Sequence, residues 1–242
     1  MKKFISIILS VLITAMLMAC SNNSQPQEEQ PLANEIYRFE SVAELENFLL
    51  DDSVRDSQGN VLKNDSDIER RCGAEFVKFK NAFVDGSNKL KVPYFTGVFG
   101  ESKNNTEYER ITVLSKELYG FSWIWYRFRI DDCYVIVKTA YMGEDFKETA
   151  EETAFPELLK QIYPDAPNVH NCSEEKWSHY KAIYGAEMCI GGKNTSALVC
   201  ETRKDERVSV FFAYEDMIVV ISGNDMILSD GFLDDLTFSA FT

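Results

Sequence analysis

Histidine is scarce in this chain of 242 residues, which holds only His170 and His179. Nucleophilic catalysis needs a base beside the nucleophile. His170 lies two residues from Cys172, but sequence neighbours need not face each other, and no cysteine-protease signature surrounds the pair. The sequence also lacks G-x-S-x-G, H-E-x-x-H, C-x-x-C and a phosphate-binding loop. We therefore predict no catalytic residue, no metal site and no cofactor from motifs.

Positive charge is also in short supply. Lys and Arg together number 25 against 39 Asp and Glu, which gives a formal net charge of −14. An acidic protein repels nucleic acid and anionic lipid headgroups, so we expect no nucleic-acid partner. Hydrophobic residues make up 45% of the chain and aromatic residues 13%, which is enough for a folded core rather than disorder.

A long apolar run occurs only at the start of the chain, from Phe4 to Ala19, directly after Lys2 and Lys3. It is shorter than the about 20 residues of a membrane span. No positive stop-transfer cluster follows it, so it fits a secretory signal segment. An ordinary signal peptide would end in small residues of the A-x-A kind, whereas this one ends in Leu17-Met18-Ala19-Cys20.

This ending resembles the lipobox of bacterial lipoproteins, with Leu three residues before the cysteine and Ala one before it. The resemblance implies that a lipoprotein signal peptidase cuts before Cys20 and that the Cys20 sulfur carries a diacylglycerol through a thioether. Two acyl chains anchor a protein stably to a bilayer. The predicted location is the extracytoplasmic face of the cell membrane, with the lipid on Cys20 as the link to that membrane. An uncleaved N-terminal membrane helix and a plain secreted protein are the alternatives.

The chain divides into three predicted segments. Residues 1–19 are the signal peptide, and their loss brings the net charge from −14 to −16, because they carry two lysines and no acid. Residues 20–35 are polar, contain two prolines and show no apolar periodicity, which is typical of a flexible tether. Residues 36–242 form an extracytoplasmic domain, with a possible division into two small subdomains near 145–170.

The domain is predicted to be α+β, with antiparallel hairpins forming one or two sheets packed against a few helices. Ser41 followed by Glu44 is a capping box that begins a helix. Residues 51–67 read as a polar loop. A further helix follows residue 144, with a break or restart at Pro156.

Two hairpins carry most of the predicted sheet. "GFSWIWYRFRI" returns as "CYVIVKTAY" after a turn at Asp131-Asp132, and this turn would pair Trp125 with Lys138 and Arg127 with Ile136. "RVSVFFAYE" and "MIVVISG" form the second hairpin and are apolar on both faces. They therefore belong in the middle of a sheet that is covered on both sides.

The order of these pieces is similar to that of uncharacterised extracytoplasmic lipoproteins of anaerobic Gram-positive bacteria. A lipobox and tether come first, and an F-x-S-x-x-E-L helix start comes next. Hydrophobic hairpins with acidic turns follow, and the end reads "MIVVISGND…FLDDLTF". The resemblance implies no catalytic residues.

Five cysteines remain besides Cys20, and they are Cys72, Cys133, Cys172, Cys189 and Cys200. An odd number cannot pair completely within one monomer, although the cell exterior permits disulfides. A hairpin centred on Asn194-Thr195 would place Cys189 opposite Cys200, close enough for a bridge. We therefore expect a Cys189–Cys200 disulfide.

The strand "FSWIWYRF" offers the most suggestive surface. Alternation places Trp123, Trp125, Arg127 and Arg129 on one face of the strand, mixing aromatic planes with fixed positive charges. Exposed, this face would stack sugar rings or hold an anionic ligand. Covered by the helix near 150–163, it would be a second core layer whose arginines reach the edge.

These patterns predict a membrane-anchored extracytoplasmic lipoprotein that binds a ligand or an envelope protein and catalyses nothing. A cell-surface hydrolase is the first alternative, because a glycosidase needs only two acids about 5 to 10 Å apart from anywhere in the chain. A purely structural envelope lipoprotein is the second. A pocket with two converging acids would favour the hydrolase.

Overall fold

The computed structural model describes residues 35–51, 54–56, 58–84, 91–96, 108–117, 121–130, 133–143, 145–162 and 180–240. The predicted signal peptide, the lipobox and the tether up to residue 34 lie outside these ranges. So do the turn residues Asp131 and Asp132 and the segment with His170, Cys172 and His179. Residues 33–242 form one compact unit.

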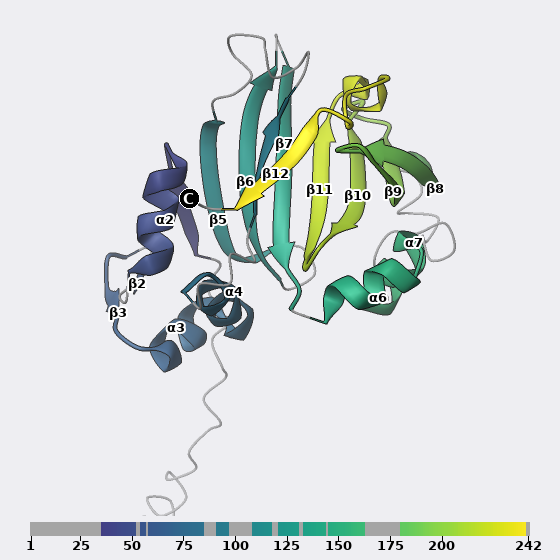
Figure 1. The fold of residues 1–242 in the computed structure, drawn as a ribbon. Helices are drawn as coiled ribbons and strands as arrows, with labels where there is room; N and C mark the ends of the chain where they lie inside the picture. Colours follow the sequence, from purple (N-terminus) through teal and green to yellow (C-terminus); the bar gives the residue numbers. More distant parts are fainter. Residues whose placement is uncertain are drawn as a thin grey trace, which may run out of the picture. The chain divides into compact units, whose positions relative to one another are not determined.

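An eight-stranded antiparallel sheet forms the centre of this unit (Figure 1) and confirms the predicted α+β class. The strand order across the sheet is β1-β5-β6-β7-β11-β10-β9-β8. The strands are β1 (Ile36–Phe39), β5 (Tyr108–Glu117), β6 (Phe121–Ile130), β7 (Cys133–Tyr141), β8 (Tyr180–Ile190), β9 (Lys193–Thr202), β10 (Val208–Tyr214) and β11 (Met217–Gly223).

Two small sheets and several helices complete the described fold. The small sheets pair β2 (Val54–Arg55) with β3 (Val61–Leu62) and β4 (Lys91–Phe95) with β12 (Leu236–Ala240). The helices are α2 (Val42–Leu50), α3 (Asp65–Cys72), α4 (Ala74–Val84), α6 (Phe146–Glu152), α7 (Phe155–Ile162) and the 3-10 helix η2 (Asp225–Leu228). Among the described helices, none has both the length and the apolarity to cross a membrane.

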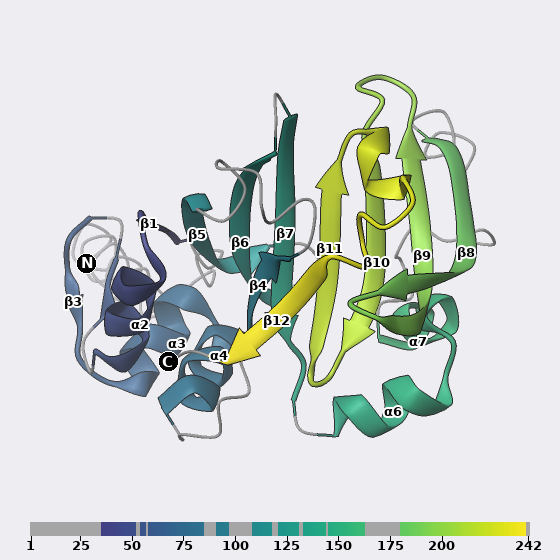
Figure 2. The same cartoon turned by 45° about the horizontal axis from the view of Figure 1, so that its top comes forward.

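The two faces of the large sheet carry two separate hydrophobic clusters. The first cluster contains alternate residues of the strands, such as Tyr126 of β6 and Val137 of β7, together with residues of α2, α3, α4, β4 and β12. The second contains the intervening strand residues, such as Ile218 and Val220 of β11, together with residues of α6 and α7. Figures 1 and 2 show β12 crossing one face of the sheet, in front of β6, β7 and β11. The sheet is therefore covered on both sides, although not along its whole length.

Local sequence signals explain where several elements begin. The Ser41 side chain accepts a hydrogen bond from Glu44 N at 3.2 Å and caps α2, as the capping box predicts. The helix after residue 144 breaks between α6 and α7, and Pro156 lies in the first turn of α7, where a missing N–H is tolerated. Both predictions are confirmed.

The predicted register of the first main hairpin is confirmed, and the second hairpin lies in the middle of the sheet as predicted. In the first, Trp125 lies opposite Lys138 and Arg127 opposite Ile136. In the second, Tyr214 pairs with Met217 across the turn, and β11 is buried along its whole length between β7 and β10. Alternation of apolar residues fixes such registers, because a slip by one residue would turn the apolar face of the strand to solvent.

The predicted polar loop over residues 51–67 is wrong in part. Asp56 folds this stretch into the β2–β3 hairpin, because its carboxylate accepts hydrogen bonds from Gln58 N at 2.9 Å and Asn60 N at 2.8 Å. Helix α3 then begins at Asp65, with Asn64 as its N-cap. Asp and Asn are strong capping residues, so the acidic run is a helix start rather than a loop.

The predicted Cys189–Cys200 disulfide is not formed, and neither cysteine belongs to a disulfide in this structure. The β8–β9 turn lies at Gly191-Gly192 instead of Asn194-Thr195, so Cys189 pairs with Asn194 and Cys200 with Ile183. Ile183 and Cys189 are six residues apart on β8, or about 20 Å at ~3.3 Å per residue. A disulfide requires Cα atoms within about 7 Å.

Candidate functional site

Trp123 is not part of an exposed ligand face, which corrects the prediction for this residue. Its side chain is fully buried, with 0% of its surface exposed. It belongs to the second hydrophobic cluster, which also holds Phe155, Leu158 and Leu159 of α7. The other interpretation of the strand, a second core layer, therefore holds for Trp123.

Trp125 lies two residues further along β6 and is only partly buried. Its ring packs against the second cluster, and the Lys138 Nζ lies over it, 3.7 Å from the ring centroid. Trp125 and Lys138 are direct cross-strand partners. Such a cation–π contact contributes about 0.5–2 kcal/mol, depending on how far water is excluded. Trp125 therefore positions a cation of its own chain, which argues against a platform for stacking sugar rings.

Arg127 makes a second contact of the same kind. Its Cζ lies 3.9 Å from the centroid of the Tyr134 ring, and Tyr134 is 43% exposed. Tyr134 is in turn the cross-strand partner of Arg129, whose side chain is exposed. Two aromatic rings thus hold two cations in place on this part of the sheet, and a third cation lies beside them.

Two further arginines come from the neighbouring strands. Arg110 of β5 is exposed and lies directly opposite Arg127. Arg38 of β1 is exposed and lies opposite Thr112, which pairs with Trp125. None of the described strand residues paired with Trp125, Arg127 or Arg129 is acidic. We call this surface the basic face, and its residues are Arg38, Arg110, Trp125, Arg127, Arg129, Tyr134 and Lys138.

Arg110 lies directly opposite Arg127 on the basic face, and like charges in such positions weaken the pairing of two strands. The basic face has the chemistry to bind anions, because guanidinium groups donate paired hydrogen bonds to phosphate, sulfate or carboxylate oxygens.

Sequence reasoning found part of this face. Trp125, Arg127 and Arg129 follow from strand alternation, and the predicted hairpin register already placed Lys138 beside Trp125. Arg38 and Arg110 were missed, because β1 and β5 are far apart in the chain and no local pattern indicates that they pair. Arg38 lies between two aromatic residues, whereas Arg110 directly follows Glu109, so the sequence offers no signal that the two share a face.

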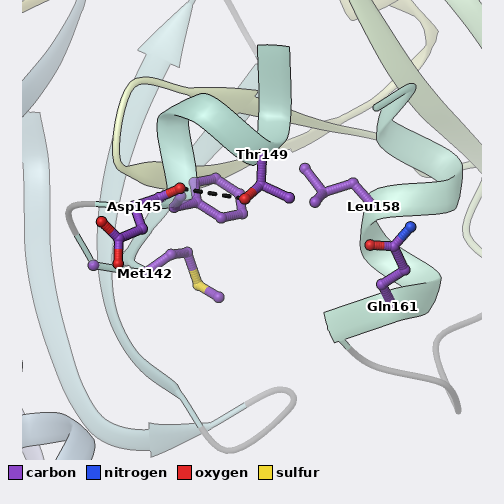
Figure 3. Close-up of a pocket in the computed structure, with 7 residues that line it drawn as sticks. Met142, Asp145, Thr149, Leu158 and Gln161 are labelled. Atoms are coloured by element: carbon purple, nitrogen blue, oxygen red, sulfur yellow. Dashed lines mark hydrogen bonds between the residues drawn. The ribbon is translucent and has the colours of Figure 1, made fainter. Parts of the chain in front are cut away.

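A shallow groove lies at helices α6 and α7 (Figure 3). It has a volume of about 380 Å³. The Thr149 hydroxyl donates a hydrogen bond of 3.3 Å to the Asp145 carbonyl oxygen at its rim. Asp145 is the single acid among the groove's lining residues, which are Met142, Gly143, Asp145, Phe146, Thr149, Leu158 and Gln161. One acid does not make the carboxylate pair of a glycosidase.

A group of titratable residues connects the start of the described chain to α3. Arg71 Nε lies 2.7 Å from Glu35 Oε1, and the Glu35 side chain is 1% exposed. The Tyr37 hydroxyl and the Cys72 sulfur are 3.7 Å apart. Burial is the main cause that raises the pKa of Cys72 to about 11, and burial also raises the pKa of Tyr37. A thiol with so high a pKa is a poor nucleophile at neutral pH, which argues against Cys72 as a catalytic nucleophile.

Within the described ranges, no three His, Cys, Asp or Glu side chains gather in a way that would hold a metal ion. No protein-family model, curated protein or solved structure matches this chain. The basic face, which gathers cations from β1, β5, β6 and β7, is therefore the strongest indication of function in this structure.

Proposed function

We propose that this protein is a lipid-anchored extracytoplasmic binding protein, and that the basic face is where it holds an anionic ligand without transforming it. The signal segment, the lipobox ending in Cys20 and the polar tether support the anchor and the location. The observation that carries the binding role is the opposition of Arg110 and Arg127 on adjacent strands, beside cations held over Trp125 and Tyr134.

Arg110 and Arg127 lie directly opposite each other on β5 and β6. Like charges in such positions repel each other and weaken the pairing of the strands. Surfaces that oppose stability in this way are characteristic of functional sites. A bound anion would relieve the repulsion between Arg110 and Arg127.

A hydrolase is less well supported than a binding protein. The groove at α6 and α7 is lined by one acid, Asp145, whereas a glycosidase needs two carboxyl groups facing one bond. A purely structural envelope lipoprotein would have no specific affinity for anions. The binding experiment below separates that alternative from our proposal.

The anchor is tested by the intact mass of the protein purified from its native membrane. We expect a mass that matches residues 20–242 plus acyl chains, and we expect a Cys20→Ala variant to lose the acyl chains. A mass that matches the full uncut chain would instead make the apolar segment a membrane helix and would overturn the lipoprotein assignment.

The binding role is tested by calorimetric titration of the full-length protein in detergent with inorganic tripolyphosphate at low salt. We expect binding that Arg127→Gln weakens about 10-fold, since a charge-assisted hydrogen bond contributes about 1.5–3 kcal/mol. Arg70→Gln is the matched control, because Arg70 is 80% exposed on α3 and pairs with Asp67. Absence of binding, or equal losses in the two variants, would refute a specific anion site.

A further inference from the structure

The geometry points to an extended polyanion as the ligand of the basic face, a linear polymer with regularly repeated phosphate groups that lies along β6. This inference rests on the proposed anion-binding function and deepens it. It separates a polymer from a compact anion, which would meet one or two cations only, and from the flat surface of a lipid bilayer.

The first support is that the cations are arranged in a line. Trp125, Arg127 and Arg129 occupy every second position of β6, and Lys138 is the cross-strand partner of Trp125. Successive positions on one face of a strand are about 6.6 Å apart. The Cα positions that carry the cations therefore extend over about 13 Å. A single phosphate group spans only a fraction of that length, so a ligand that engages the whole line has to be extended.

The second support is that aromatic rings hold two of the cations. Lys138 lies over Trp125 and Arg127 over Tyr134, at 3.7 and 3.9 Å from the ring centroids. Long basic side chains lose about 2 kcal/mol of rotamer freedom when they are fixed. Ordering them before the ligand arrives removes part of that cost from binding. The rings thus act on the cations rather than on the ligand, and the ligand needs charges but no sugar ring to stack.

The third support concerns the surrounding negative charge. The mature chain carries a net charge of −16, so its surface as a whole repels anions. Repulsion between exposed charges is largely screened beyond about 8 Å at physiological salt. A thin chain lying along one strand contacts little of the surface beyond the basic face. A bilayer plane would extend further over a chain whose full-length net charge is −14, which disfavours an anionic membrane as the partner.

Inorganic phosphates of increasing length provide the test, measured with the full-length protein in maltoside micelles. The probes are orthophosphate, tripolyphosphate and a long-chain polyphosphate. We expect the affinity per molecule to rise steeply from orthophosphate to tripolyphosphate and again to the long chain. We also expect the long-chain affinity to fall roughly 20-fold between 50 and 200 mM salt, as for a ligand that contacts about three cations.

Variants assign the effect to residues. Arg127→Gln, Arg129→Gln and Lys138→Gln should each weaken long-chain binding and reduce the salt slope by about one charge. Arg70→Gln should change neither quantity. Trp125→Leu should weaken binding while leaving the salt slope almost unchanged, because it removes the ring under Lys138 and no charge. Circular dichroism of each variant shows whether the fold is kept, and Arg129→Gln, at an exposed position, provides the comparison if Trp125→Leu fails to fold.

Three other outcomes would reject the polymer, and one of them would also reject the anion-binding function. Equal affinity per molecule for orthophosphate and long-chain polyphosphate would overturn the polymer and leave the anion-binding function standing. No binding of any phosphate would overturn both. Phosphatidylglycerol doped into the micelles is the competitor. If it displaced the long chain from the wild type, the basic face would belong to lipid headgroups and the polymer would be rejected.

Discussion

The thiol of Cys189 donates a hydrogen bond to the carboxylate of Asp234, with 3.1 Å between Sγ and Oδ1. The same oxygen accepts a hydrogen bond of 2.7 Å from Gly192 N. One carboxylate from the segment before β12 thus fastens the tip of the β8–β9 hairpin. The contact also has a chemical effect, because the hydrogen bond to Asp234 is the largest cause that raises the pKa of Cys189.

This contact predicts how reactive the Cys189 thiol is. Asp234→Asn keeps the size of the side chain and removes its negative charge, so the pKa of Cys189 should fall toward its usual value. Because the thiolate is the reactive form, iodoacetamide should label Cys189 faster at pH 8 in the variant. Peptide mass mapping follows Cys189 separately from the other cysteines. An unchanged pH midpoint of labelling would show that Asp234 does not control this thiol.

Gly191 and Gly192 form the turn that Asp234 fastens, and they differ in what surrounds them. Gly191 has φ +56°, and a Cβ there would lie 2.6 Å from the Leu236 carbonyl oxygen. Gly192 has φ +76° and open space around it. Gly191→Ala should therefore lower the free energy of unfolding by more than 2 kcal/mol, whereas Gly192→Ala should cost about 1 kcal/mol from backbone strain alone. Chemical denaturation of both variants makes the comparison, and equal losses would contradict the predicted clash.

The two glycines also explain why one hairpin register could be predicted and another could not. The β6–β7 register follows from a two-residue acidic turn between strands with clear alternation. The stretch "GGKNTS" allows several turn centres, and the choice of Asn194-Thr195 was wrong. A two-residue hairpin turn favours residues with φ above zero at both positions, which Gly191 and Gly192 supply. The mistaken centre also produced the mistaken Cys189–Cys200 disulfide.

The candidate site was predictable only in part for a similar reason. Alternation identifies which residues share a face of β6, but it does not say what covers that face. Trp123 and Trp125 look equivalent in sequence, yet the second cluster buries Trp123 completely and Trp125 only in part. Coverage depends on where α6 and α7 pack, and that is a tertiary property that no local pattern contains.

Asp56 predicts how stability changes at low pH. Its pKa is lowered first by the hydrogen bond from the Asn60 side chain and further by backbone donors and Arg71. A carboxyl group with a lowered folded-state pKa stabilises the fold above its unfolded pKa of about 3.9, and this contribution is lost as the pH falls through the folded value. Asn60→Ala should therefore reduce stability at pH 7 and move the start of acid unfolding to higher pH. Thermal melts from pH 2 to 7 measure both effects, and parallel stability curves for wild type and variant would exclude this role for Asp56.

The ion pair of Glu35 and Arg71 predicts that Glu35, the last residue of the predicted tether, is fastened to the domain. Glu35 is 1% exposed and Arg71 31% exposed at the side chain. Glu35→Ala therefore leaves Arg71 with only the more distant carboxylate of Asp56, 3.8 Å from its Nε. We expect a loss of about 2 kcal/mol, below the 3–5 kcal/mol of a fully buried pair. Arg70→Gln, which breaks the exposed pair with Asp67, should cost less than about 1 kcal/mol. Urea denaturation of both variants tests the difference, and a Glu35→Ala variant as stable as wild type would remove this link.

Repulsion within the basic face predicts that stability and binding change in opposite directions. Arg110 lies opposite Arg127, whereas Arg38 on the same face lies opposite the neutral Thr112. Arg110→Gln should therefore raise the free energy of unfolding by about 0.2–1 kcal/mol at low salt, and the gain should shrink as salt screens the repulsion. Arg38→Gln removes the same charge from the same face and should give a smaller gain. Denaturation at low and high salt, with phosphate titration of the same samples, measures both properties. A destabilised Arg110→Gln variant would mean that attractive contacts hold Arg110. Repulsion between Arg110 and Arg127 would then no longer support anion binding by the basic face.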